Sequence, residues 1–148
     1  MSLTVTIVRH PMENRAKCSL TPLEGRPGFR FHTAGDGFSL DGSGHTLLAL
    51  DAPAISPADA GRPLLLLDST WRHLPTLRAC VTGEPAARSL PPVTTAYPRV
   101  SKLFQDPAAG LASVEALYLA ARLLGERDDS LLDGYRWRET FLERCAEY

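Results

Sequence analysis

Four consecutive leucines constrain the fold of this chain more than any other stretch. They occupy positions 64–67, follow Pro63 and end at Asp68, so the run has no polar side that could face water. An unbroken apolar run of this length is typical of a central strand in a parallel sheet, which helices cover on both faces. In open α/β sheets, ligands bind at the carboxyl ends of such strands. The sequence therefore predicts an α/β protein with Asp68 at its ligand-binding edge.

The remaining elements are predicted from turn residues and from the spacing of apolar residues. Pro and Gly divide the first two thirds of the chain into short pieces, of which 4–9, 29–32 and 45–50 are predicted strands. A short helix is expected up to about Cys80, begun late or interrupted because of Pro75.

The last third is predicted to be helical. Ser113 can cap a helix that ends at Gly125, with apolar residues at helical spacing between them. A second helix is expected to open at Asp128 and to run towards Tyr148, packing its broad apolar face over the sheet.

Length and composition limit the function classes. The 148 residues predict a single compact domain, 1–148, made of a strand-and-loop portion at 1–62 and the portion 63–148. A formal net charge of -1 excludes an overall positive field and leaves only a local basic patch for nucleic acid. Three widely separated cysteines lack zinc-site or disulfide spacing, so no metal is expected. Without a signal peptide or a long apolar span, a soluble, cytoplasmic monomer with no membrane contact is expected.

Two segments combine residues that could carry chemistry. Asp68 and Trp71 could supply a base and a stacking wall at the end of the leucine strand, or Asp68 could cap the next helix while Trp71 lies in the core. Ser113 and Glu115 could hold a zwitterionic ligand at a helix start, although ordinary capping also explains them. The long loop 90–102 is either functional or a connector.

Six short motifs occur in one order over nearly the whole chain. In that order they resemble the aminocarboxypropyltransferases that modify small-subunit ribosomal RNA, whose motifs are K-C-T/S, S-P/x-x-D, D-C-S-W, L-P, L-S-x-V-E-A and F-x-W-G-x-x-F-L. The DSTW at 68–71 is also similar to the D-x-T-W signature of the DTW-domain enzymes, which modify tRNA uridine, but the C-terminal match favours the ribosomal branch. The matching segments are 17–19, 55–59, 64–71, 74–77, 111–117 and 135–142.

The resemblance implies a fold, a reaction and a set of site residues. The fold would be SPOUT-like, with a parallel sheet, a small N-terminal β-rich portion and a C-terminal trefoil knot in the cofactor-binding portion 63–148. The reaction would transfer the 3-amino-3-carboxypropyl group of S-adenosylmethionine, a co-substrate, to a uridine or pseudouridine base in rRNA, with Asp68 as catalytic base. The implied contacts of S-adenosylmethionine are Ser19, Ser56, Trp71, Leu90, Leu111, Ser113, Glu115 and Ala116.

Basic residues next to these motifs predict where RNA would bind. If they converge in space, they form a phosphate-binding rim around Asp68. The acidic excess of the last 37 residues predicts that the two terminal helices face away from the RNA. The predicted rim consists of Arg9, Arg15, Lys17, Arg72, Arg99 and Lys102.

The chain departs from the family pattern in two places, which leaves other functions open. Residues 94–102 replace an asparagine- and glycine-containing loop of the family, and Arg138 stands where glycine is usual. The alternatives are a SPOUT-like RNA methyltransferase and a non-catalytic RNA-binding or ribosome-assembly protein that keeps the fold.

Overall fold

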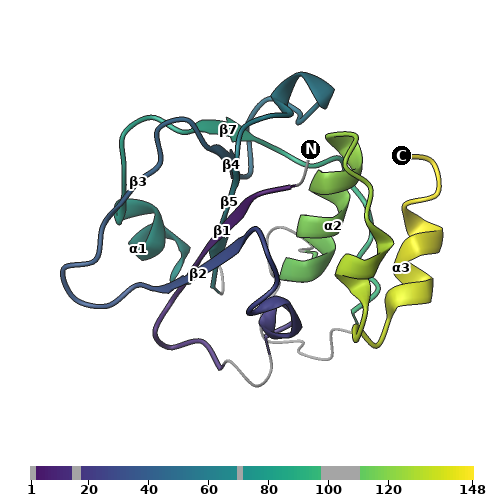
Figure 1. Cartoon of the computed structure of the whole chain (residues 1–148), viewed down its shortest axis with the longest axis horizontal. Helices are drawn as coiled ribbons and strands as arrows, with labels where there is room; N and C mark the ends of the chain where they lie inside the picture. The colour runs from purple at the N-terminus through teal and green to yellow at the C-terminus, as the bar shows by residue number, and fades with distance from the viewer. Residues whose placement is uncertain (1–2, 15–17, 70–71, 98–110) are drawn as a thin grey trace.

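A five-stranded parallel sheet forms the centre of the molecule (Figure 1). The computed structural model describes residues 3–14, 18–69, 72–97 and 111–148. The strand order is β2-β1-β5-β4-β7, and every neighbouring pair in it is parallel, which confirms the α/β class. The strands are β1 (Val5–Arg9), β2 (Phe29–Thr33), β4 (Thr46–Leu48), β5 (Leu64–Asp68) and β7 (Ala86–Arg88), while β3 (Leu40–Asp41) and β6 (Val81–Thr82) form a separate parallel pair. Strands from 1–62 and from 63–148 therefore share one sheet.

The leucine run is the central strand, as predicted. β5 is third in the order, and its side chains alternate between two buried clusters. Leu64 and Leu66 belong to the cluster that contains the C-terminal helices, whereas Leu65 belongs to the cluster on the opposite face. This two-sided burial explains why the run has no polar position.

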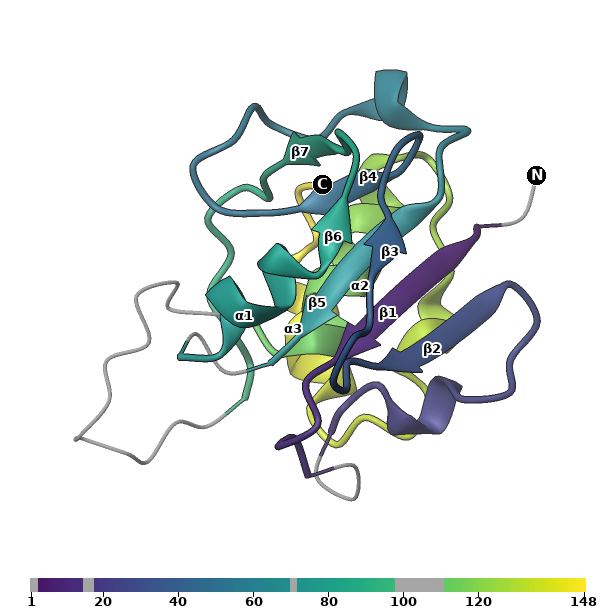
Figure 2. The same cartoon turned by 90° about the vertical axis from the view of Figure 1, so that its left-hand side faces the viewer.

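Helices cover both faces of the sheet. They are α1 (Leu74–Ala79), α2 (Ser113–Leu123) and α3 (Arg138–Arg144). Figure 2 shows α1, β3 and β6 in front of the sheet, with α2 and α3 behind it. α2 packs on the sheet, whereas α3 lies on the side of α2 away from the sheet (Figure 1) and reaches the core through Phe141 and Cys145. The late start of α1, with Pro75 in its first turn, agrees with the sequence prediction.

The predicted continuous helix from Asp128 is wrong. The chain instead forms the 3₁₀ helix η4 (Asp129–Leu132), then a turn, and begins α3 only at Arg138. Gly134 adopts φ 82° in that turn, a left-handed conformation that a helix cannot contain. The apolar face read from the sequence is real, but two short helices share it.

Asp129 links η4 to α2 and should make stability sensitive to acid. It accepts hydrogen bonds from Arg127 Nε at 2.9 Å and from the Tyr118 hydroxyl, and these contacts lower the pKa of Asp129 to about 2. A carboxylate with a lowered pKa stabilises the folded state above its unfolded pKa, and this contribution is lost as the pH falls towards 2.

On acidification from pH 5 to pH 2, we expect the Asp129→Asn variant to lose about 1 kcal/mol less stability than the wild type, because it lacks the titrating carboxylate. Solvent screening of this one-third exposed group keeps the difference small. Urea unfolding at both pH values measures the difference. Equal acid sensitivity of the two proteins would contradict the prediction.

Candidate active site

The carboxyl ends of the parallel strands bring together residues that are far apart in the sequence. β1 ends at Arg9 and β5 ends at Asp68, and these two residues are paired in the register of the sheet. The backbone N–H of His10 also donates to the carbonyl of Asp68 at 3.1 Å. The edge expected to bind ligands is therefore the edge at which Asp68 lies.

The Asp68 carboxylate is almost fully buried and accepts three side-chain hydrogen bonds. Ser113 Oγ donates to Oδ1 at 2.8 Å, while Cys18 Sγ at 3.0 Å and Arg9 Nε at 3.3 Å donate to Oδ2. Only 6% of Asp68 is exposed. Helix α1 begins after His73 without a side-chain cap, so the alternative that Asp68 caps the following helix is wrong.

Cys18 acts as a hydrogen-bond donor in this group. Its pKa is raised by burial and further by the neighbouring Asp68 carboxylate, so the thiol stays protonated near neutral pH. Its sulfur also lies 3.4 Å from the backbone nitrogen of Leu20 and 3.4 Å from Arg9 Nη2. Cys18 is therefore a structural partner of Asp68 rather than a nucleophile.

Arg9 is buried, which does not fit its predicted role in a phosphate-binding rim. Its side chain is 3% exposed, and Nη1 binds Glu24 Oε1 at 2.9 Å. Its guanidinium also lies over the Phe31 ring, 5.2 Å from the centroid. All these contacts keep Arg9 inside the protein. Of the other predicted RNA contacts, Arg72 is exposed, whereas Arg15, Lys17, Arg99 and Lys102 lie outside the described residues.

Two serines flank the start of α2, next to Asp68. Ala112, not Ser113, is the N-cap, so the prediction that Ser113 caps this helix is wrong. The Ser113 hydroxyl is directed to Asp68 instead. Ser19 Oγ accepts the N–H of Val114 at 3.1 Å, so a distant segment caps the helix. The structure thus brings Ser19 and Ser113 to the same group as Asp68.

Glu115 is fully buried and fixes the preceding loop to α2. Oε1 accepts the N–H of Ala112 at 2.8 Å and the Thr95 hydroxyl, and Oε2 accepts the N–H of Ala96 at 2.9 Å. Arg144 of α3 donates to the carbonyl of Thr95. Both oxygens of Glu115 serve the protein's own backbone and side chains, so the loop before residue 98 is an anchored segment.

The other proposed contacts of S-adenosylmethionine are distributed around these residues. Ser56 caps the 3₁₀ helix η3 (Pro57–Asp59), and the bridge between Ala54 and Ser89 places it beside the segment that enters Leu90. Ala116 is half-buried in α2, and Trp71 lies outside the described residues. Leu90 and Leu111 are partly buried against the core that contains α2.

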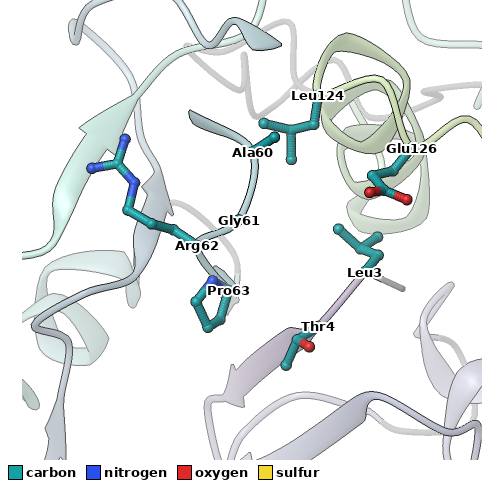
Figure 3. A pocket seen from close by; sticks show the side chains of 8 residues that line it. All are labelled: Leu3, Thr4, Ala60, Gly61, Arg62, Pro63, Leu124 and Glu126. Atoms are coloured by element: carbon teal, nitrogen blue, oxygen red, sulfur yellow. The ribbon is translucent and has the colours of Figure 1, made fainter. Parts of the chain in front are cut away.

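The described residues of the motifs combine apolar surface and polar groups, as small-molecule sites do. Leu90 and Leu111 are apolar and partly buried, while the Asp68 carboxylate and the Ser19 and Ser113 hydroxyls are polar. By contrast, the hollow in Figure 3 lies at the opposite edge, before β1 and β5, and its cavity volume is about 100 Å³. That volume is below the usual range of ligand pockets.

The part of the chain that the structure describes holds neither a metal-binding cluster nor a membrane-spanning helix. No group of three or more His, Cys, Asp or Glu side chains in this part of the chain could hold a metal ion. Across the same residues, no helix combines the length and hydropathy needed to cross a membrane.

The fold is shared with a transferase that modifies ribosomal RNA. That protein is the S-adenosylmethionine-dependent rRNA aminocarboxypropyltransferase Tsr3 from Vulcanisaeta distributa, and the two structures align with a TM-score of 0.75. The alignment covers 100% of this chain and 81% of Tsr3 at 22% sequence identity. No protein-family model and no curated protein matches the chain. Tsr3 is thus an rRNA aminocarboxypropyltransferase, the class of enzyme that the six sequence motifs resemble.

Proposed function

We propose that this chain is an S-adenosylmethionine-dependent aminocarboxypropyltransferase that modifies a uridine or pseudouridine base in rRNA. One observation carries the proposal: hydrogen bonds join three of the motifs. Ser19 accepts the backbone N–H of Val114 at the start of α2, and Ser113, on the same helix, donates to Asp68. These residues come from the first, third and fifth of the six motifs. The fold shared with Tsr3 supports the same proposal.

In this proposal Asp68 accepts the proton of a uracil-type N–H. The nitrogen then forms a bond to the carbon of the aminocarboxypropyl arm that is attached to sulfur, and the bond between that carbon and sulfur breaks with its electrons left on sulfur. The products are the modified base and methylthioadenosine. An ionised carboxylate has about four lone-pair sites, and the three described donors leave room for one more hydrogen bond.

The surrounding residues would select which carbon of the sulfonium reacts. The Ser19 hydroxyl accepts the N–H of Val114 and keeps its own proton to donate to the ribose. Ser56, Ser113 and Trp71 would hold the aminocarboxypropyl arm, and Leu90, Leu111, Ala116 and Trp71 would enclose the adenine and the sulfonium. Orientation of this kind decides the product, because all three carbons on the sulfur are activated.

Two finer features belong to the same proposal. We expect the C-terminal trefoil knot that the resemblance implies, within the portion 63–148. We also expect RNA to bind through Arg72 and the predicted rim residues Arg15, Lys17, Arg99 and Lys102, without Arg9. A rim of so few charges would favour a folded RNA or a pre-ribosomal particle over a single strand.

The reaction product tests the proposal directly. We expect the protein, S-adenosylmethionine and an unmodified or pseudouridine-containing small-subunit rRNA transcript to release methylthioadenosine, and the RNA to gain one aminocarboxypropyl group by mass spectrometry. A reaction with heat-denatured protein is the control. Release of S-adenosylhomocysteine would instead identify a methyltransferase. RNA binding with unchanged S-adenosylmethionine would identify a non-catalytic protein.

A further inference from the structure

Arg9 joins three segments of the chain through one side chain. Its Nε binds Asp68 at the end of β5, its Nη1 binds Glu24 after the 3₁₀ helix η2 (Thr21–Leu23), and its Nη2 contacts Cys18 at 3.4 Å. A guanidinium can make these contacts at once because its five donors lie in one rigid plane. The ammonium of lysine cannot reproduce this geometry.

The local charges require this arrangement. Burying the Asp68 carboxylate is costly unless a cation and hydrogen bonds compensate it. Among the described residues, Arg9 is the cation that contacts it, while Ser113 and Cys18 contribute neutral donors. Glu24, which is about one quarter exposed, holds the opposite side of the guanidinium. The orientation of Asp68 therefore depends on Arg9.

Arg9 also reaches the turn that contains Ser19. Cys18, which Arg9 contacts, accepts the N–H of Leu20 at 3.4 Å, so both neighbours of Ser19 are fixed to the same group. Ser19 then caps α2 through Val114. A change at Arg9 would thus reach two parts of the site.

We propose that Arg9 is a positioning residue for the transfer reaction, which sets the orientation of Asp68 and of the Ser19 turn together. The inference rests on the proposed function. It assigns to Arg9 a role inside the site instead of contact with RNA phosphates. It also predicts two separate effects of changing Arg9, one on the rate of transfer and one on the affinity for S-adenosylmethionine. Asp68 governs the rate of transfer, whereas the Ser19 turn governs the affinity for S-adenosylmethionine.

The test combines Arg9→Met with Asp68→Asn. We expect Arg9→Met to lower kcat about 30-fold, less than the roughly 100-fold that misplacement of a reacting group by 1 Å can cost. We also expect it to raise the Kd for S-adenosylmethionine, measured by calorimetry, about fivefold, in keeping with one weakened hydrogen bond. In the double variant, kcat should equal that of Asp68→Asn alone and Kd should equal that of Arg9→Met alone.

Several results would overturn the inference. One is an unchanged kcat or an unchanged Kd in Arg9→Met. Another is a double variant whose kcat falls by the product of the two single losses, which would mean that Arg9 and Asp68 act independently. If Arg9→Met does not fold, Arg9→Lys retains the charge without the three-way contact and should show the same two losses; wild-type values for both constants would count against the inference. A wild type that releases no methylthioadenosine would refute the proposed function, while Kd would still report on the Ser19 turn.

Arg26 offers a matched control. It is also a partly buried arginine that lies over an aromatic ring, Phe29, and binds a carboxylate, Asp128, at 2.6 Å. Arg26 is not part of the group around Asp68. Arg26→Met should therefore lower the free energy of unfolding without changing kcat per folded molecule or the Kd. A loss of kcat in this control as large as that in Arg9→Met would mean that any buried arginine has the same effect, and would contradict a specific role for Arg9.

Discussion

Replacing Asp68 with asparagine is expected to lower turnover about 100-fold, the usual contribution of a positioned general base. The amide keeps the size of the side chain but cannot accept the proton of the target N–H. Affinity for S-adenosylmethionine should remain, because the apolar contacts of the adenine do not involve Asp68. Turnover is measured as methylthioadenosine released per folded molecule, with ligand affinity from calorimetry on the same preparation.

The control for this variant separates chemistry from stability. In either orientation, the N–H₂ of the new amide would face a hydrogen-bond donor: Arg9 and Cys18 on one side, or Ser113 on the other. Two donors cannot bond to each other, so the variant should be less stable and a fraction of its molecules unfolded. Ser113→Ala removes one donor from Asp68 but keeps the carboxylate, and its turnover should fall by less than about tenfold. Normal turnover per folded Asp68→Asn molecule would show that Asp68 is a structural carboxylate and not the base.

Replacing Glu115 with alanine is expected to cost about 3 kcal/mol of stability. Two backbone N–H groups, those of Ala96 and Ala112, would lose a charged acceptor, and each such bond contributes about 1.5 kcal/mol. The loss should be concentrated in the loop next to α2. Hydrogen exchange at the Ala96 amide is expected to accelerate about tenfold or more. The midpoint of urea unfolding is expected to fall as well.

Glu143 on α3 is the comparison for that prediction. Its side chain is exposed, so Glu143→Ala should change the free energy of unfolding by less than about 0.5 kcal/mol. If Glu115→Ala were as mild as Glu143→Ala and left Ala96 protected, the buried carboxylate would not be the anchor of the loop.

Much of the sheet could be predicted because its strands carry a local signal. The apolar run at 64–67 and the β-branched run ending at Arg9 identify buried strands without reference to the rest of the chain. The split of the last helix was harder to predict. The apolar spacing continues across Gly134, and a glycine alone does not show that the backbone adopts a left-handed conformation there.

A residue of the candidate site could be predicted only where its position follows from a single strand. Asp68 follows from the end of β5, but the burial of Arg9 follows from the register between β1 and β5, which is a relation between two distant segments. The same reason explains why Glu24 was missed and why the contacts of Glu115 with Thr95 and Ala96 were not predicted. A signal was present, because an arginine and an aspartate each end an otherwise uncharged run, as opposite charges that pair side by side would.

The anchoring of residues 95–97 has a consequence for how such a protein can diverge. Glu115 binds Thr95 and Ala96, and Arg144 binds the carbonyl of Thr95. The rings of Tyr97 and Trp137 pack in a T-shaped arrangement with their centroids 4.8 Å apart. These contacts all hold residues before residue 98 and do not involve β5, the strand that carries Asp68. Under the proposed function, selection can alter residues 98–102, the last part of the segment that departs from the family pattern, and change the RNA that is recognised while the contacts of Asp68 are retained.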